Sequence, residues 1–583
     1  MLHPDQLGGE GHLGSTVSRD MSFWGPDQST VVSSLTRTIH AYFPQLSSTD
    51  SQQLVEESFR QADTRYGLET ASAWAEGFRV PWAHVEKDIE RFNLAGGSVV
   101  KLASMMRQER GLDRLTTARV ELMVSPSNPD YARIHRMAAL GVEVLVGPDF
   151  RPSGIAGRPP LRAKYQDSGG AVDRMIYEAF LSSNLAVALP ISTLESCLVK
   201  GESLNFSASS WATKYGKACG RNVVDCGDGG TGSGLNSDDV KMMADEIWAP
   251  IHHPNLLTIV HMIQDFFVQA QTKDPSVSWD DLRLWKMDLS GAFTLLDFDP
   301  GGVPFLATEL QGERERIAVF YLCGLFGWTA MPMAFQVVTR VIKWELSRPG
   351  VLQGLMDMYT DDMFGVCLQR DLARDMEQAR TFCKQLLGSK SIEERKTESG
   401  RRLTITGWDI DLDRSLVAIS RKNVMKAFYG FSSVNLEAPI DVKRVQAWAS
   451  WAERYGEICL FMRPFRYVLY RQIPRWCRHK VTRRNKRVVM VRLTEEAKWV
   501  VRLYSALLSL TLLHETTFTR PFVSFQLSRP SLVIRFDGCL GGAGVIWYGG
   551  DAATALSLDP LTRGLPALGG VAVDLRSLGF GED

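Results

Sequence analysis

Two neighbouring aspartates, Asp361 and Asp362, stand at the centre of a largely apolar segment, LQGLMDMYTDDMFGVCLQ, which spans residues 352–369. Adjacent carboxylates repel each other, and burying either without a partner costs free energy. The pair therefore predicts a site that is open to water or that holds positive charge. A third aspartate, Asp288, ends the alternating segment LRLWKMD.

The segments around these three aspartates predict strands that bring them together. Leu284, Lys286 and Asp288 alternate with apolar residues as on one face of a strand. The flanks of Asp361 and Asp362 have β character, so we expect a hairpin with the pair at its tight turn. Three clustered carboxylates suit Mg²⁺, and two such ions stabilise the attacking and leaving oxygens in phosphoryl transfer.

Helices and further strands are expected to support this sheet. AFQVVTRVIKWEL, residues 334–346, predicts a helix with Pro332 just before its start. LARDMEQARTFCKQLL, residues 372–387, predicts a second helix that Gly388 ends. RRLTITGWDIDLDRSLVAIS, residues 401–420, alternates as two more strands.

Motifs around the aspartates carry a family resemblance. WKMDLSGAF contains Asp288 and, five residues on, Phe293; LFGWTAMPMAFQ contains Gly327 and Pro332; YTDD follows. In this order the motifs resemble those of a reverse transcriptase, over roughly residues 205–420. The resemblance implies an α+β right-hand polymerase with fingers, palm and thumb. It also implies two Mg²⁺ ions, with Mn²⁺ as a substitute, and an RNA template, a DNA primer and dNTPs as partners.

The same resemblance implies roles for single residues. Asp288, Asp361 and Asp362 would bind metal, and Lys396 would protonate the leaving pyrophosphate. Lys214 and Arg221 would grip the triphosphate, and Phe293 would exclude a 2′-hydroxyl. Further dNTP contacts are implied for Gly327 and Gln336, and nucleic-acid contacts for Trp328, Pro332, Gly407 and Trp408.

Two positions depart from the family pattern. Phe326 stands where many relatives carry Gln, and Gly407–Trp408 replaces the commoner Leu-Gly. Neither change removes a predicted metal ligand.

Residues 463–494 contain eleven Lys or Arg, no Asp or Glu, and interleaved aromatic residues. Such a segment can follow a phosphate backbone and stack on bases. A solvated helix face or a nuclear-import signal would have the same composition. Behind a polymerase palm, nucleic-acid contact is the better interpretation, with these candidate residues: Arg466, Arg471, Arg475, Lys480, Arg483 and Arg484.

The C-terminal segment SLVIRFDGCLGGAGVIWYGG resembles the opening of a ribonuclease H domain, in which Asp537 would be the first metal-binding carboxylate. Only 46 residues follow Asp537. We therefore expect a partial domain, and a chain that is a fragment of a retrotransposon polyprotein, of the tyrosine-recombinase class by overall similarity.

Composition bounds the remaining possibilities. Lys+Arg and Asp+Glu balance at 66 each, the nine Cys include no C-x-x-C pair, and no run of eighteen apolar residues occurs. We expect an intracellular, soluble protein without structural zinc. The expected organisation is a disordered N-terminus (1–30), a helical region of unnamed role (31–145), a linker (146–170), fingers and palm (171–425), a basic thumb and connection (426–525) and the partial ribonuclease H-like segment (531–583).

Two rival functions stay open. A viral-type RNA-dependent RNA polymerase shares the palm, but usually carries an Asp five residues after the first motif's aspartate, where this chain has Phe293. An inactive or domesticated element remnant would bind nucleic acid without chemistry. The intact aspartates argue against it, whereas the incomplete C-terminus and Phe326 favour it.

Overall fold

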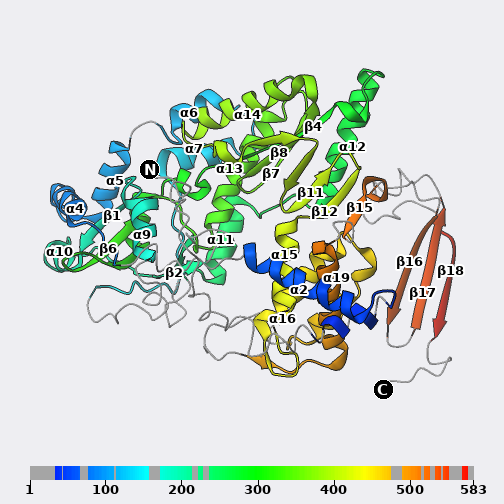
Figure 1. The fold of residues 1–583 in the computed structure, drawn as a ribbon. Coiled ribbons are helices and arrows are strands. Elements are labelled where there is room, and N and C mark those ends of the chain that lie inside the picture. Colours follow the sequence, from blue (N-terminus) through cyan, green and yellow to red (C-terminus); the bar gives the residue numbers. More distant parts are fainter. Residues whose placement is uncertain are drawn as a thin grey trace. The chain divides into compact units, whose positions relative to one another are not determined.

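The structure is a computed structural model, and the chain divides into two compact units, Met1–Arg520 and Pro521–Asp583. Helices and antiparallel sheets are mixed throughout the first unit (Figure 1), as expected for an α+β chain. The described part of the chain runs from residue 33 to 574, apart from these positions: 34, 38, 42–43, 66–76, 111–112, 156–170, 213–220, 227–234, 433, 475–488, 514–517, 526–531, 540–541 and 550–566.

A four-stranded antiparallel sheet lies at the centre of the first unit. Its order is β7-β8-β4-β9, with β7 at Leu355–Tyr359, β8 at Asp362–Leu368, β4 at Leu282–Asp288 and β9 at Glu398–Gly400. β7 and β8 form the expected hairpin, and β4 is the expected strand. The strand β4 pairs with β8 along its whole length.

Helices α12 (Leu256–Lys273), α13 (Met331–Leu346) and α14 (Leu372–Leu387) pack against strands of this sheet (Figure 1). Both helices predicted from periodicity are confirmed, and Gly388 ends α14 with φ +111°. Pro332 is the second residue of α13, not the residue before it. Proline is tolerated there because the first-turn N–H groups of a helix have no partner within the helix.

Smaller sheets flank the central one. β1 (Ala186–Pro190), β6 (Arg316–Tyr321) and β5 (Ala307–Gln311) form one sheet, and β2 (Ala208–Ala212) pairs with β3 (Arg221–Asp225). Residues 401–420 form three strands, not two: β10 (Arg402–Ile405), β11 (Trp408–Asp411) and β12 (Leu416–Ile419). The extra reversal lies between β11 and β12, where Ser415 has φ +52°.

The N-terminal helices do not form a separate hydrophobic core. α4 (Trp82–Leu94), α5 (Val99–Glu109), α6 (Thr117–Met123) and α7 (Tyr131–Leu140) contribute to the same cluster of buried residues as β1, β6 and α13. Ion pairs add to this packing. Arg107, Arg110 and Arg114 all reach one carboxylate, Asp297, at 3.9, 3.3 and 2.9 Å.

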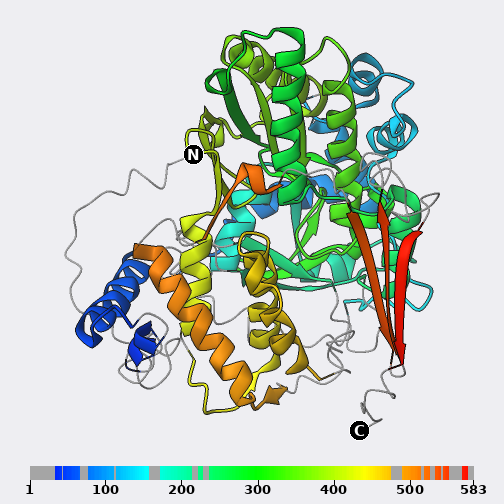
Figure 2. The same cartoon turned by 90° about the vertical axis from the view of Figure 1, so that its right-hand side faces the viewer.

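Another group of helices follows the strands β10–β12. α15 (Arg421–Ser432), α16 (Val442–Gly456), α17 (Phe465–Arg471) and α19 (Glu495–Leu513) pack together. The distant N-terminal helix α2 (Ser48–Arg65) lies beside α19 (Figure 2). The helix α2 is capped by Ser47, whose hydroxyl accepts a hydrogen bond from the Asp50 amide.

Further elements of the first unit are α9 (Ala171–Ile176), a π-helical turn (Tyr177–Leu181), α10 (Ile191–Cys197), α11 (Asp238–Trp248), β13 (Ile440–Asp441) and β14 (Met490–Val491). In the second unit β16 (Leu532–Cys539), β17 (Gly542–Gly549) and β18 (Ala567–Asp574) form an antiparallel sheet. None of the described helices contains a stretch that is both long and apolar enough to cross a bilayer.

Candidate active site

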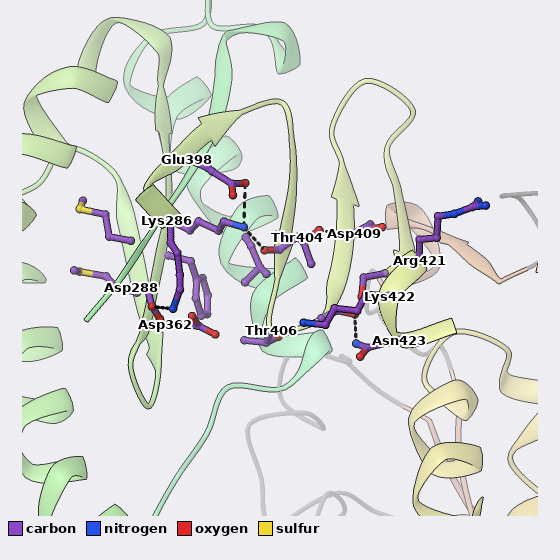
Figure 3. A pocket seen from close by; sticks show the side chains of 17 residues that line it. Lys286, Asp288, Asp362, Glu398, Thr404, Thr406, Asp409, Arg421, Lys422 and Asn423 are labelled. Atoms are coloured by element: carbon purple, nitrogen blue, oxygen red, sulfur yellow. Dashed lines mark hydrogen bonds and ion pairs between the residues drawn. The ribbon is translucent and has the colours of Figure 1, made fainter. Parts of the chain in front are cut away.

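The pairing register of β4 and β8 sets two of the three aspartates opposite each other. Asp288 is the last residue of β4 and faces Asp362, the first residue of β8. Asp361 occupies the turn just before it, and its carbonyl accepts a hydrogen bond from the Leu289 amide at 2.9 Å. Residues that lie 73 and 74 positions apart in the sequence thus converge at one end of the sheet, and Figure 3 shows Asp288 and Asp362 side by side there.

A lysine completes this acidic cluster. Lys396 comes from the segment before β9, and its Nζ forms an ion pair with Asp288 Oδ2. The backbone fixes the approach of this segment, because the Glu393 amide donates to the Asp288 carbonyl at 2.9 Å. Of the residues predicted to act in catalysis, the structure therefore brings together Asp288, Asp361, Asp362 and Lys396.

The carboxylates perturb one another. The pKa of Asp362 is raised from 3.8 to about 7, first by burial, then by the charge of Asp361, and then by the hydrogen bond and charge of Asp288. The Lys396 ammonium opposes this shift. One ammonium against three carboxylates leaves an excess of negative charge, which disfavours ionisation of Asp362.

This donor set fits a hard divalent cation. Carboxylate oxygens are the ligands that Mg²⁺ and Mn²⁺ prefer. Burial is the largest cause of the raised pKa of Asp362, and the neighbouring carboxylates Asp361 and Asp288 add to it. Across the described residues, no group of three or more His, Cys, Asp and Glu side chains has the arrangement of a formed metal site. The ammonium of Lys396 instead contacts Asp288.

The turn that carries Asp361 is held by a hydrogen bond from α13. Thr360 has a left-handed backbone, with φ +54°. Its carbonyl accepts a hydrogen bond from Thr339 Oγ1 of α13 at 3.1 Å. Such strain in a non-glycine residue persists only where surrounding contacts hold it.

A polar cavity of about 470 Å³ opens beside Asp288 and Asp362. Its far wall comes from β10, β11 and the start of α15, with Thr404, Asp409 and Lys422 among the lining residues (Figure 3). Lys286 crosses it, paired with Glu398 at 3.0 Å and donating to the Thr404 carbonyl at 3.2 Å.

A second cavity, of about 480 Å³, adjoins the other side of the turn. It is lined by Tyr359, Asp362, Gly407, Trp408 and Arg454, among others. Gly407 and Trp408, two of the residues predicted to contact nucleic acid, thus line the same cavity as Asp362. A side chain at Gly407 would lie 2.3 Å from Asn423 Nδ2, and Arg454 covers the Trp408 ring at 4.5 Å.

The predicted sugar-selecting residue lies in an aromatic stack. Phe293 is only 8% exposed, and its ring lies 4.9 Å from that of Phe326. Phe326 is 40% exposed. The ring predicted to meet the sugar is therefore largely buried, and it contacts the rings of Phe335 and of Phe326, the residue that departs from the family pattern.

Two predictions for the second motif are wrong. Trp328 is 1% exposed and packs edge-on against Trp248 and Phe298, so its side chain belongs to the core and cannot contact nucleic acid. Gln336 is also buried, and its amide donates to the His252 carbonyl at 3.3 Å rather than facing a nucleotide. Both residues lie where α13 and its N-terminal approach pack inward.

Gly327 is needed for a close approach, although not one that the sequence predicted. Its φ is +114°, and a Cβ would lie 1.8 Å from the Val224 carbonyl oxygen of β3. The Val224 amide also donates to the Phe326 carbonyl at 2.9 Å. Gly327 thus joins the second motif to the β2–β3 hairpin. Pro332, in the first turn of α13, is half-buried.

The predicted triphosphate-binding residues are placed only in part. Arg221 begins β3, opposite Ala212 of the antiparallel strand β2. Lys214 lies outside the described residues.

The basic segment is likewise described only in part. Arg466 and Arg471 belong to α17, and Arg466 pairs with Glu453 at 3.0 Å. Outside the described residues lie Arg475, Lys480, Arg483 and Arg484. In the second unit, Asp537 is on β16 opposite Gly544 of β17, and its assignment to a ribonuclease H-like site stays a prediction.

Sequence reasoning missed two residues beside the acidic turn. His253 lies in the loop before α12, and its ring stacks on that of Tyr359 with 4.2 Å between centroids. Burial lowers the pKa of His253. Arg454 lies on α16, and its guanidinium donates to the Thr406 carbonyl at 2.5 Å. Nothing in the local spacing of either residue signals these contacts.

No known family profile matches the sequence, and no curated protein matches it significantly. Among solved structures, the chain is similar to the foamy viral protease-reverse transcriptase. The complex of its dRH form with double-stranded DNA is 12% identical with a TM-score of 0.38 and covers 79% of this chain and 67% of that one. The complex with an RNA/DNA hybrid is 11% identical with a TM-score of 0.38, over 78% and 52%. A further complex with double-stranded DNA is 11% identical with a TM-score of 0.36, over 79% and 81%. A likeness at these TM-scores says nothing about function. The function proposed below depends instead on the carboxylate cluster.

Proposed function

We propose that this chain is a reverse transcriptase, an RNA-directed DNA polymerase of a retroelement that extends a primer 3′ end with deoxynucleotides. The observation that carries the proposal is the register of β4 and β8, which sets Asp288 opposite Asp362 with Asp361 at the adjoining turn. The order of the motifs around these residues supports it.

The acidic cluster would hold the cofactor. Asp288 and Asp361, supported by Asp362, would bind two Mg²⁺ ions, or Mn²⁺ in their place. When bound, such ions supply charge stabilisation for the attacking and leaving oxygens of an in-line displacement. Burial and the neighbouring carboxylates raise the pKa of Asp362, and the repulsion among the three carboxylates is what would favour cation binding here.

Lys396 supports the chemistry as a proton donor. Its ammonium is close enough to pair with Asp288, so it lies at the edge of the cluster where the pyrophosphate would leave. A general acid must lie within hydrogen-bond reach of the group that it protonates. We assign Lys396 the role of protonating the pyrophosphate oxygen as its bond to the α-phosphorus breaks.

The second cavity would receive the primer end. Tyr359, Gly407 and Trp408 line it together with Asp362, next to the acidic turn. Arg454 supplies positive charge to the same cavity, which suits a phosphate backbone. Template and product would continue toward α17 and the basic segment, where Arg466 and Arg471 lie.

The incoming dNTP would bind on the opposite side, between the carboxylates and the β2–β3 hairpin. Arg221 on β3 and Lys214 are the proposed phosphate ligands. Phe293 follows Asp288 by five residues, so its ring is the proposed barrier to a 2′-hydroxyl.

Primer extension on a defined RNA template with dNTPs, with and without Mg²⁺, tests this proposal. We expect metal-dependent extension that is lost in Asp361→Asn and in the double variant Asp361→Asn/Asp362→Asn, with template binding retained. Asp149→Asn, at an exposed position outside the site, is the matched control and should extend normally.

The outcomes separate the rival functions. Preference for NTPs over dNTPs would identify an RNA-dependent RNA polymerase. Tight RNA binding without extension at any Mg²⁺ or Mn²⁺ concentration would identify a remnant that only binds. Near-normal extension by Asp361→Asn would refute the assignment of the acidic turn.

A further inference from the structure

We propose that His253 is a positioning residue for the acidic turn, acting through its stack on Tyr359. The inference rests on the proposed polymerase function, because the turn holds two of the proposed metal ligands. It concerns a residue outside every motif discussed above, in the loop between α11 and α12.

The stack joins two elements that are distant in sequence. The rings of His253 and Tyr359 lie 4.2 Å apart between centroids, with 25° between their planes. Tyr359 is the last residue of β7 and directly precedes the turn of Thr360 and Asp361. It is 38% exposed and lines the second cavity together with Asp362. A residue that fixes this ring therefore acts on a wall of the proposed primer site.

Helix α13 pins both partners through their neighbours. Gln336 donates to the carbonyl of His252, and one turn later Thr339 donates to the carbonyl of Thr360. Residues three apart on a helix lie on the same side. The backbone positions next to His253 and next to Tyr359 are thus anchored to adjacent points of one rigid element.

The loop that carries His253 is held at both of its ends. At its start the Trp248 carbonyl accepts a hydrogen bond from Arg340 of α13 at 2.7 Å, and Ala249 has φ +67°. At its end Asn255 caps α12 by accepting from the Thr258 amide at 2.9 Å. A left-handed backbone at a non-glycine residue persists only where surrounding contacts hold it. The loop therefore has one conformation, which fixes the position of the His253 side chain.

The remaining side of Tyr359 faces the cavity. Gly407, Trp408 and Arg454 also line this cavity. Without the His253 ring, Tyr359 keeps its backbone but loses the surface that limits its rotation. The ring can then turn away from the wall that the primer end would contact, and the adjoining carboxylates lose their alignment with that end.

The test compares three variants in steady-state primer extension. His253→Ala should lower kcat by about 3- to 10-fold, the range expected for loss of one aromatic pair, with the KM for dNTP nearly unchanged. His253→Phe keeps a stacking ring without the imidazole nitrogens and should restore kcat to near the wild-type value. His252→Ala changes only the neighbouring side chain and keeps the carbonyl that Gln336 uses, so it should extend normally.

A second readout does not need catalysis. With 3-fluorotyrosine at position 359, the ¹⁹F resonance should shift in His253→Ala and return toward the wild-type position in His253→Phe. Wild-type kcat in His253→Ala, or failure of His253→Phe to restore it, would overturn the positioning role. An unmoved ¹⁹F resonance in His253→Ala would overturn the stack itself. If the wild-type protein extends no primer, but the ¹⁹F resonance still shifts on going from wild type to His253→Ala, the polymerase proposal is refuted and the stack is supported.

Discussion

Replacing Asp362 by Asn should stabilise the metal-free protein at neutral and alkaline pH. The pKa of Asp362 is raised from 3.8 to about 7 by burial, by Asp361 and by Asp288. The folded state therefore binds this proton more tightly than the unfolded state does. The resulting stabilisation is complete below about pH 4 and is lost as pH rises through about 7. Asparagine removes the ionisation while its amide can still donate to Asp288.

The magnitude follows from the size of the shift. A change from 3.8 to about 7 corresponds to a ceiling of about 4 kcal/mol, at about 1.4 kcal/mol per pH unit. Solvent reaches the exposed side of Asp362, and screening reduces the effect to about 1–2 kcal/mol. We expect Asp362→Asn to unfold at a Tm about 2 °C above that of the wild type at pH 8, and at the same Tm at pH 4.

Thermal unfolding at pH 4, 6 and 8, with EDTA and with Mg²⁺, measures this difference. The proposed binding of Mg²⁺ to the folded carboxylates should raise the Tm of the wild type at pH 8 more than that of Asp362→Asn, because ligand binding to the folded state alone adds stability. Asp149→Asn is the control for loss of an exposed carboxylate. Equal Tm values for wild type and Asp362→Asn at pH 8, or a gain that does not depend on pH, would refute the electrostatic reasoning.

Three other substitutions test separate parts of the structure. Asp297→Asn leaves the buried Arg110 without its carboxylate and should destabilise the fold by about 3–5 kcal/mol, as measured by urea unfolding; a loss below 1 kcal/mol would contradict this. Gly327→Ala places a Cβ 1.8 Å from the Val224 carbonyl at φ +114°, so we expect a lower Tm and lost extension, and wild-type behaviour would show that β3 can move aside. Phe293→Ala should raise NTP use relative to dNTP use by roughly 10-fold in single-nucleotide incorporation; an unchanged ratio would assign the barrier to another residue.

Local pattern determined the elements that carry the site. Alternation over LRLWKMD and around YTDD predicted β4 and the β7–β8 hairpin, and 3.6-residue periodicity predicted α13 and α14. These features depend on neighbours within one element, so the sequence contains them directly. The same reasoning predicted two strands in residues 401–420, where the structure has three, because it did not predict the reversal between β11 and β12, where Ser415 has φ +52°.

The sequence by itself also determined the chemistry: three aspartates and a lysine in an order that suits divalent cations. Only the tertiary structure decided which side chains meet. It buried Trp328 and Gln336, joined Asp297 to three arginines, placed Lys396 on Asp288 and stacked His253 on Tyr359. Such contacts depend on how separate helices and strands pack, and no periodicity within one segment records the identity of a distant neighbour.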